Sequence, residues 1–181
     1  MEDKYIPIYD IANKMLELVS EIMENLGKLS NVNELEKLPR LRKTNRIKSI
    51  HSSLAIENNT LSIEQVTDVI NGKRVLAPQR DIEEVHNAHL AYEMLNDIDP
   101  FNISDLLKVH GIMMNGLVKE AGKLRSGQVG VYNQEGKVVH LAPPAEFVPQ
   151  QLGQLFDWVK SSDANMLIKS SVFHYEFEFI H

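Results

Sequence analysis

Residues 128–141 read QVGVYNQEGKVVHL, and their pattern differs from that of the rest of the chain. Two short runs rich in β-branched residues, 128–132 and 137–141, flank the polar turn 133–136, which contains a glycine. Such a pattern predicts a β-hairpin. Ala142-Pro143-Pro144 follows directly, and the hairpin ends there because proline cannot donate a hydrogen bond to a strand ladder.

The chain on both sides of this hairpin has the periodicity of helices. Apolar residues recur at intervals of three and four, which places them on one face of a helix. The first such stripe consists of Ile11, Met15, Leu18, Ile22 and Leu26. A single hairpin within an otherwise helical chain predicts an all-α fold, a helical bundle from which one β-hairpin projects.

Several residues mark where the predicted helices begin and end. Gly27 is a candidate terminator of the first helix, and the second helix stops near Asn58-Asn59. Ser62 with Gln65 three positions later forms a capping box, and Ser104 is a further candidate cap. The last helix is predicted to begin near Asp163.

Composition limits the classes of function. The 181 residues fit one domain, or one domain with a small accessory piece, and the formal charge of −6 argues against a nucleic-acid partner for this segment. With no cysteine there is no disulfide, thiolate metal site or cysteine nucleophile. No signal peptide is visible, and no apolar stretch approaches the ~18 residues needed to span a bilayer. We therefore expect a cytoplasmic protein without a membrane contact.

Two clusters of polar side chains have ordinary explanations. His86 and His89 could share a helix face, but no Asp, Glu or His completes a metal site, so we interpret them as surface or core histidines. The second cluster is basic and could bind phosphate, although the favoured interpretation is a solvated helix face. Its members are Arg40, Arg42, Lys43, Arg46 and Lys48.

The segment 53–58, SLAIEN, is more informative than either cluster. Ser53 and Glu57 are four residues apart and so share one helix face. A glutamate in the last turn of a helix opposes the helix dipole, which suggests that the Glu57 carboxylate has a cationic partner elsewhere. The alternative is a solvated glutamate followed by Asn58 as a helix stop.

This segment and three later ones resemble the Fic family of nucleotidyl transferases. Residues 53–58 resemble the family's inhibitory helix, (Ser/Thr)-x-x-x-Glu-(Gly/Asn), in the subgroup that carries this helix before the catalytic core. Residues 124–127, the hairpin and 140–144 are similar to the family's flap, and 147–158 to the helix after it. Residues 173–181 resemble the helix that leads into the catalytic signature, of which His181 would be the first residue.

The resemblance also implies a domain organisation. Residues 1–39 form an N-terminal helix and linker, and 40–181 form a Fic-like core with the inhibitory helix and the flap. The chain stops within an apolar, aromatic run at 177–181, so we expect this core to be incomplete at the C-terminus. We also expect this chain by itself to be inactive.

The implied activity is autoinhibited protein adenylylation, the transfer of AMP from ATP to a protein hydroxyl with Mg²⁺. His181 would be the general base, and Ser53, Glu57 and Asn58 the regulatory residues. The flap edge that docks the target would consist of Val138, Val139, His140 and Leu141. Ligands for ATP and Mg²⁺ are expected beyond residue 181, with no metal ligand in this chain. The partner would be a protein with a Ser, Thr or Tyr hydroxyl, and the sequence leaves a homodimer open.

A second hypothesis comes from a different class of protein. The chain could be a catalytically silent helical module that binds a peptide or partner protein through its hairpin. The residues that follow His181 in the gene discriminate between the two hypotheses. The sequence does not identify the target protein or the preferred nucleotide.

Overall fold

The computed structural model describes residues 6–29 and 39–180. The fold is mostly helical, as predicted, and the described residues contain a single two-stranded antiparallel sheet. The elements divide into two compact units. Unit 1 comprises residues 1–31 and 124–181, and unit 2 comprises residues 32–123.

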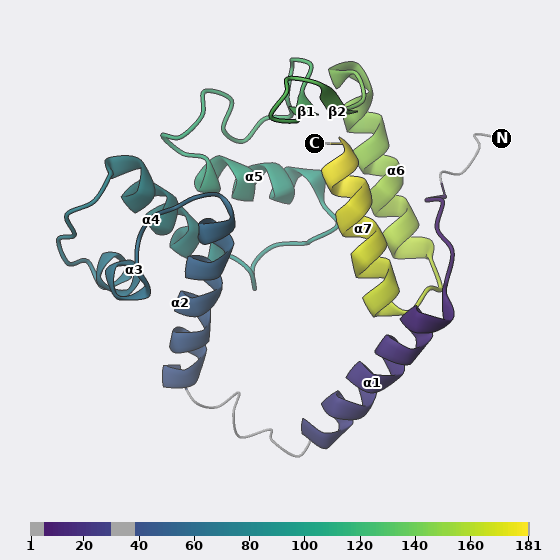
Figure 1. Cartoon of the computed structure of the whole chain (residues 1–181), viewed down its shortest axis with the longest axis horizontal. Coiled ribbons are helices and arrows are strands. Elements are labelled where there is room, and N and C mark those ends of the chain that lie inside the picture. The colour runs from purple at the N-terminus through teal and green to yellow at the C-terminus, as the bar shows by residue number, and fades with distance from the viewer. Residues whose placement is uncertain (1–5, 30–38, 181) are drawn as a thin grey trace. The chain divides into compact units, whose positions relative to one another are not determined.

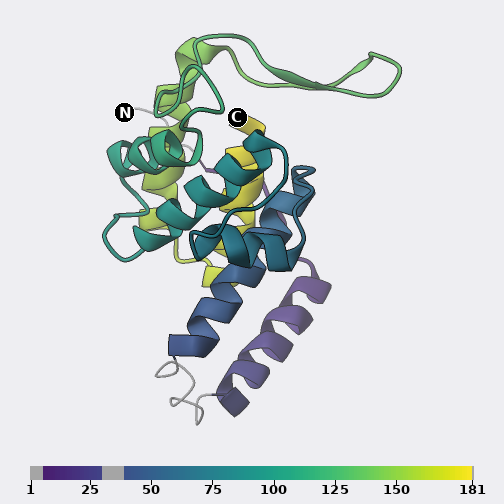
Figure 2. The ribbon, with the colours of Figure 1, turned by 90° about the vertical axis from the view of Figure 1, so that its left-hand side faces the viewer.

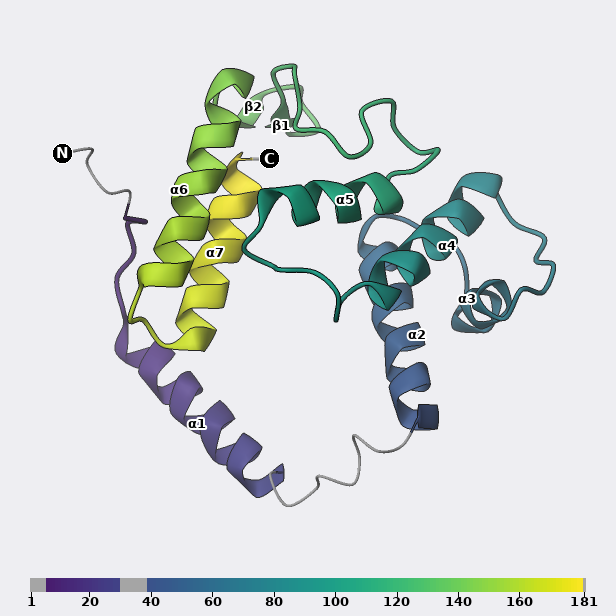
Figure 3. The ribbon, with the colours of Figure 1, turned by 180° about the vertical axis from the view of Figure 1, so that it is seen from behind.

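Unit 2 contains four helices, α2 (Pro39–Ile56), α3 (Ile63–Ile70), α4 (Gln79–Glu93) and α5 (Ile103–Met113). Helix α4 packs against each of the other three (Figure 3). The apolar faces of α2, α3 and α4 meet in one core, in which Ile50, Val66 and Val85 are fully buried. The burial of Ile50 follows from the helical spacing in α2, which also buries Ile47 three residues earlier.

The helix ends in unit 2 use conventional caps. The capping box is confirmed, because the Ser62 side chain accepts from the Gln65 N–H while the Gln65 side chain accepts from the Ser62 N–H. The prediction for Ser104 is wrong, since Asn102 caps α5 and its side chain accepts from the Ser104 N–H at 2.8 Å.

Unit 1 contains α1 (Asn13–Leu29), the strands β1 (Gly130–Tyr132) and β2 (Val138–Leu141), the short 3₁₀ helix η3 (Ala145–Phe147), α6 (Val148–Ser161) and α7 (Met166–Ile180). Helices α6 and α7 lie side by side (Figures 1 and 3). The hairpin extends from them as a narrow arm (Figure 2). Gly27 does not end α1, which continues to Leu29, and the last helix begins at Met166, three residues later than predicted.

Aromatic and apolar side chains hold α6 and α7 together. Phe156 of α6 stacks on Phe173 of α7, with ring centroids 5.9 Å apart. Trp158, the only tryptophan of the chain, is buried, and Tyr9 packs against it edge-on at 6.1 Å. The buried Lys169 side chain donates to the Ser162 carbonyl at 2.6 Å. Ser162 caps the C-terminal end of α6, where partial negative charge favours a cation.

Candidate functional site

Helix α2 ends in a tight reversal at Asn58. The Asn58 N–H donates to the Ala55 carbonyl at 3.2 Å, and the Asn59 N–H donates to the Leu54 carbonyl at 3.0 Å. Asn58 has a φ of 66°, the left-handed conformation that such a C-terminal reversal requires. Asparagine adopts it more readily than most residues. The predicted stop at Asn58-Asn59 is therefore present, and its geometry explains why an asparagine stands there.

Glu57 lies between the last residue of α2, Ile56, and this reversal. Its side chain is exposed, and its carboxylate forms no hydrogen bond or ion pair with any residue of the described ranges. Ser53 is also exposed, and no hydrogen bond joins it to Glu57. The structure thus presents an exposed carboxylate at the end of a helix that is firmly terminated.

The segment that follows the reversal is fixed to α4. The Asn59 side-chain amide donates to the Asp81 carbonyl at 3.0 Å and to the Glu84 carboxylate at 2.9 Å. The Thr60 hydroxyl and N–H both donate to the Asp81 carboxylate, at 2.5 and 2.9 Å. These two bonds lower the pKa of Asp81 below its ordinary value, with the hydroxyl as the larger cause. The hydrogen bonds of Asn59 and Thr60 to α4 thus restrict the backbone position of the neighbouring Glu57 within unit 2.

Part of the basic cluster is engaged within unit 2. Arg46 forms an ion pair with Glu93 of α4, and the Lys43 ammonium donates to the Asn71 side chain at 2.7 Å. The exposed members include Arg40, Arg42 and Lys48. Among the described residues, no group of three or more His, Asp or Glu side chains could hold a metal ion.

The hairpin in unit 1 is irregular. Gly130 pairs with Leu141 and Val131 with His140, but Tyr132 pairs with Val138, so Val139 is an extra residue that forms a bulge. Val138, Val139 and Leu141 are exposed, at 47%, 65% and 56% of their surfaces. Since the sheet has two strands among the described residues, each strand has an edge without a strand partner. Such an edge can accept an extended peptide.

His140 differs from the other three predicted docking residues. It is half-buried, and its Nε2 lies 3.0 Å from the Phe179 carbonyl in the last turn of α7. Its ring also contacts the Phe179 ring, with centroids 4.7 Å apart. A carbonyl only accepts, so Nε2 carries the proton in this contact. The His140 side chain therefore faces α7, and the sequence pattern gave no indication of this direction.

Arg125 is a site residue that the sequence analysis did not single out. Its guanidinium donates to three main-chain carbonyls, which are those of Gly127 at 3.0 Å, Pro143 at 2.5 Å and Ile180 at 3.0 Å. Gly127 precedes the hairpin, Pro143 follows it, and Ile180 ends α7. Arg125 thus joins both ends of the flap to the residue before His181. His181 itself lies outside the described residues.

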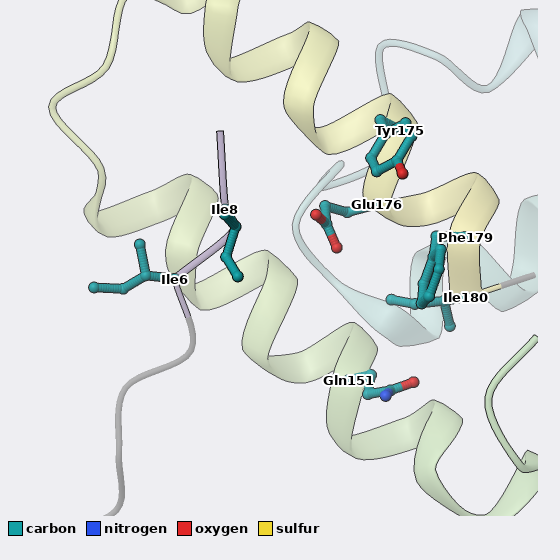
Figure 4. Close-up of a pocket in the computed structure, with 7 residues that line it drawn as sticks. All are labelled: Ile6, Ile8, Gln151, Tyr175, Glu176, Phe179 and Ile180. Atoms are coloured by element: carbon teal, nitrogen blue, oxygen red, sulfur yellow. The ribbon is translucent and has the colours of Figure 1, made fainter. Parts of the chain in front are cut away.

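A cavity of about 510 Å³ lies beside the C-terminal half of α7 (Figure 4). It is lined by Ile6, Ile8, Gln151, Tyr175, Glu176, Phe179 and Ile180. The lining is largely apolar, and the Gln151 side-chain oxygen is buried without a hydrogen-bond partner in the described structure. The cavity adjoins the same helical turn that Arg125 and His140 contact.

The part of the chain that contains the hairpin and α7 matches a known protein family. Residues 100–181 match the Fic/DOC family. Helices α5, α6 and α7 and the flap lie within this range. Residues 53–58 lie outside it.

The structure is similar to the crystal structure of a Fic family protein from Desulfovibrio desulfuricans G20. The two chains are 49% identical, with a TM-score of 0.90 over 98% of this chain and 54% of that one. The sequence is also similar to proteins named protein adenylyltransferase fic-1. The Caenorhabditis briggsae protein is 28% identical and the Caenorhabditis elegans protein 27% identical, each over 94% of this chain. This chain spans 34% of the length of each of these two relatives.

No helix among the described residues is both long enough and apolar enough to cross a membrane.

Proposed function

We propose that the protein transfers AMP from ATP to a hydroxyl group of a target protein. The observation that carries this proposal is the similarity to two proteins named adenylyltransferases along 94% of the chain. The Fic/DOC match over 100–181 and the similarity to a Fic family structure support it independently. The residues that match the Fic/DOC family contain the flap and α7, the two elements that the chemistry would need.

The flap would hold the target in an extended conformation. A target segment can add its backbone hydrogen bonds to a free strand edge, and the exposed side chains of Val138, Val139 and Leu141 offer apolar contacts beside it. Docking in this way would fix the hydroxyl group relative to the flap. Correct orientation of reacting groups contributes strongly to enzymatic rates.

His181 would act as the general base. An imidazole is suited to this role because its pKa lies near neutrality. It would take the proton of the target hydroxyl while the oxygen forms a bond to the α-phosphorus of ATP. The bond between that phosphorus and the bridging oxygen breaks, and pyrophosphate leaves. In this proposal ATP and Mg²⁺ would be held by the remaining residues of the family's signature, beyond residue 181.

Glu57 would limit this reaction. In our proposal its exposed carboxylate pairs with an arginine of the family's signature, beyond residue 181, and occupies space that the γ-phosphate needs. A hydrogen bond to a charged group contributes about 1.5–3 kcal/mol, so a modest conformational change would release the inhibition. The hydrogen bonds of Asn59 and Thr60 to α4 would keep the carboxylate in place.

The test uses the full-length product of the gene that encodes this chain, with ATP labelled on the α-phosphate. The wild-type protein should label a protein target or itself, and His181→Ala should abolish labelling while ATP binding persists. His174→Ala is the matched control, since His174 lies on the same helix with an exposed side chain. Undiminished labelling by His181→Ala would refute the assignment of the base.

The silent binding module remains the alternative, and the exposed apolar side chains of β2 are the observation that favours it. It predicts no labelling by the wild-type protein or by any variant. It also predicts that peptide binding survives His181→Ala. Labelling by the wild-type protein would exclude it.

A further inference from the structure

We infer that Arg125 is a positioning residue, which holds the last turn of α7 against the flap and so aligns the residue that follows it. This inference rests on the proposed function, in which that following residue, His181, is the base. The relevant contacts, here called the Arg125 clamp, join the guanidinium to the carbonyls of Gly127, Pro143 and Ile180. All of them lie within unit 1.

The clamp satisfies the chemistry of a helix C-terminus. The last carbonyls of a helix have no partner within it and carry partial negative charge. The Arg125 guanidinium supplies both a positive charge and a donor to the Ile180 carbonyl. His140 donates to the neighbouring Phe179 carbonyl at 3.0 Å. Two flap-associated side chains therefore bind two successive carbonyls at the end of α7.

Binding at these carbonyls restricts the direction of the chain. The peptide group is planar, so a hydrogen bond that fixes the Ile180 carbonyl also restricts how the backbone leaves this residue. The guanidinium is itself a rigid plane, with its donors in a fixed arrangement. The guanidinium also binds the carbonyls on each side of the hairpin. The same side chain therefore fixes the base of the flap and the end of α7 relative to each other.

The hairpin has other bonds that close its base. The Ala142 N–H donates to the Val129 carbonyl at 3.1 Å, and the Gln128 side chain donates to the Ala142 carbonyl. Loss of the Arg125 side chain should therefore leave the hairpin formed while it releases α7. This separation makes the inference testable, because the positioning role can be removed without unfolding the flap.

The first measurement is hydrogen exchange in the full-length gene product. Arg125→Met should increase exchange in the last turn of α7 by about tenfold or more, since a charge-assisted bond is lost. Exchange in α6 should not change. Arg40→Met is the matched control, because Arg40 lies in unit 2 with an exposed side chain. Unchanged exchange at the end of α7 in Arg125→Met would overturn the inference, whether or not the protein transfers AMP.

The second measurement separates a positioning role from a structural one. In Arg125→Met, kcat for AMP transfer should fall about tenfold or more while the affinity for ATP stays at the wild-type value. His140→Gln, which retains a donor, should keep more activity than His140→Phe, which retains only the ring. Faster exchange with wild-type kcat would overturn the positioning role. A wild-type protein without AMP transfer would instead contradict the proposed function, and the exchange comparison would still decide whether the clamp exists.

Discussion

Gly130 of β1 faces the main-chain carbonyl of His140 so closely that an added Cβ would lie 2.8 Å from that oxygen. Real Cβ atoms essentially never approach an oxygen this closely, and the oxygen belongs to the backbone, which cannot rotate away as a side chain would. The contact requires glycine at this position and ties the shape of β1 to that of β2.

Gly130→Ala should therefore distort the hairpin. Overpacking costs about 1–3 kcal/mol, so amide exchange across 128–141 should increase between about fivefold and a hundredfold. The matched control is Gly127→Ala, because an added Cβ at Gly127 meets no atom within 4 Å. Equal exchange in the two variants would mean that the hairpin does not depend on this close contact.

Asn58 supports a prediction about stability. Asn58→Ala should lower the free energy of unfolding by about 1 kcal/mol, since alanine lacks the local hydrogen bonds that help asparagine adopt a left-handed conformation. Asn58→Gly should be neutral or slightly stabilising, because glycine adopts a positive φ without steric cost. Urea denaturation of the three proteins measures the difference. Equal destabilisation by both substitutions would show that the side chain of Asn58, and not its conformation, is what matters.

Asp81 supports a prediction about pH. Its folded-state pKa lies below the ordinary value of 3.8, so its ionised form stabilises the fold above that pH, and the contribution is lost as the pH falls through the folded-state pKa. The difference in unfolding free energy between the wild type and Asp81→Ala should thus be present near neutrality and shrink below pH 3.8. Thr60→Val should reproduce part of the loss at neutral pH, since the Thr60 hydroxyl is the largest cause of the lowered pKa. A difference that stays constant across this range would contradict the role of ionisation.

Glu57 supports a prediction about regulation. Glu57→Gln keeps the size of the side chain and removes its charge, so AMP transfer by the full-length gene product should increase by about tenfold or more. Glu21→Gln is the control, since Glu21 of α1 is also exposed. A solvated glutamate without a regulatory role predicts equal labelling by the two variants and the wild type.

Much of the fold followed from local patterns. The hairpin was predicted because its β-branched runs and glycine turn are adjacent in sequence, and the observed strands lie within the predicted runs. The start of a helix is harder to predict where two possible capping residues lie close together. Asn102 and Ser104 both have side-chain oxygens that can cap α5, and Asn102 is the cap. Gly27 has no steric demand and lies two residues before the end of α1, so it was an unreliable marker.

The contacts of the candidate site were less accessible to sequence reasoning. Arg125 binds main-chain carbonyls 18 and 55 residues away, and a carbonyl group is common to every residue, so no pattern of residue types identifies these partners. The orientation of His140 likewise depends on the bulge at Val139, which shifts the alternation of β2. Only the folded chain brings these groups together.

We propose AMP transfer that depends on His181 and is restrained by Glu57. It is tested most directly by labelling with α-phosphate-labelled ATP in three forms of the full-length gene product, the wild type, Glu57→Gly, and Glu57→Gly with His181→Ala. Glu57→Gly should label protein about tenfold or more above the wild type, and the added His181→Ala should remove this labelling. Labelling by the double variant equal to that of Glu57→Gly would contradict it.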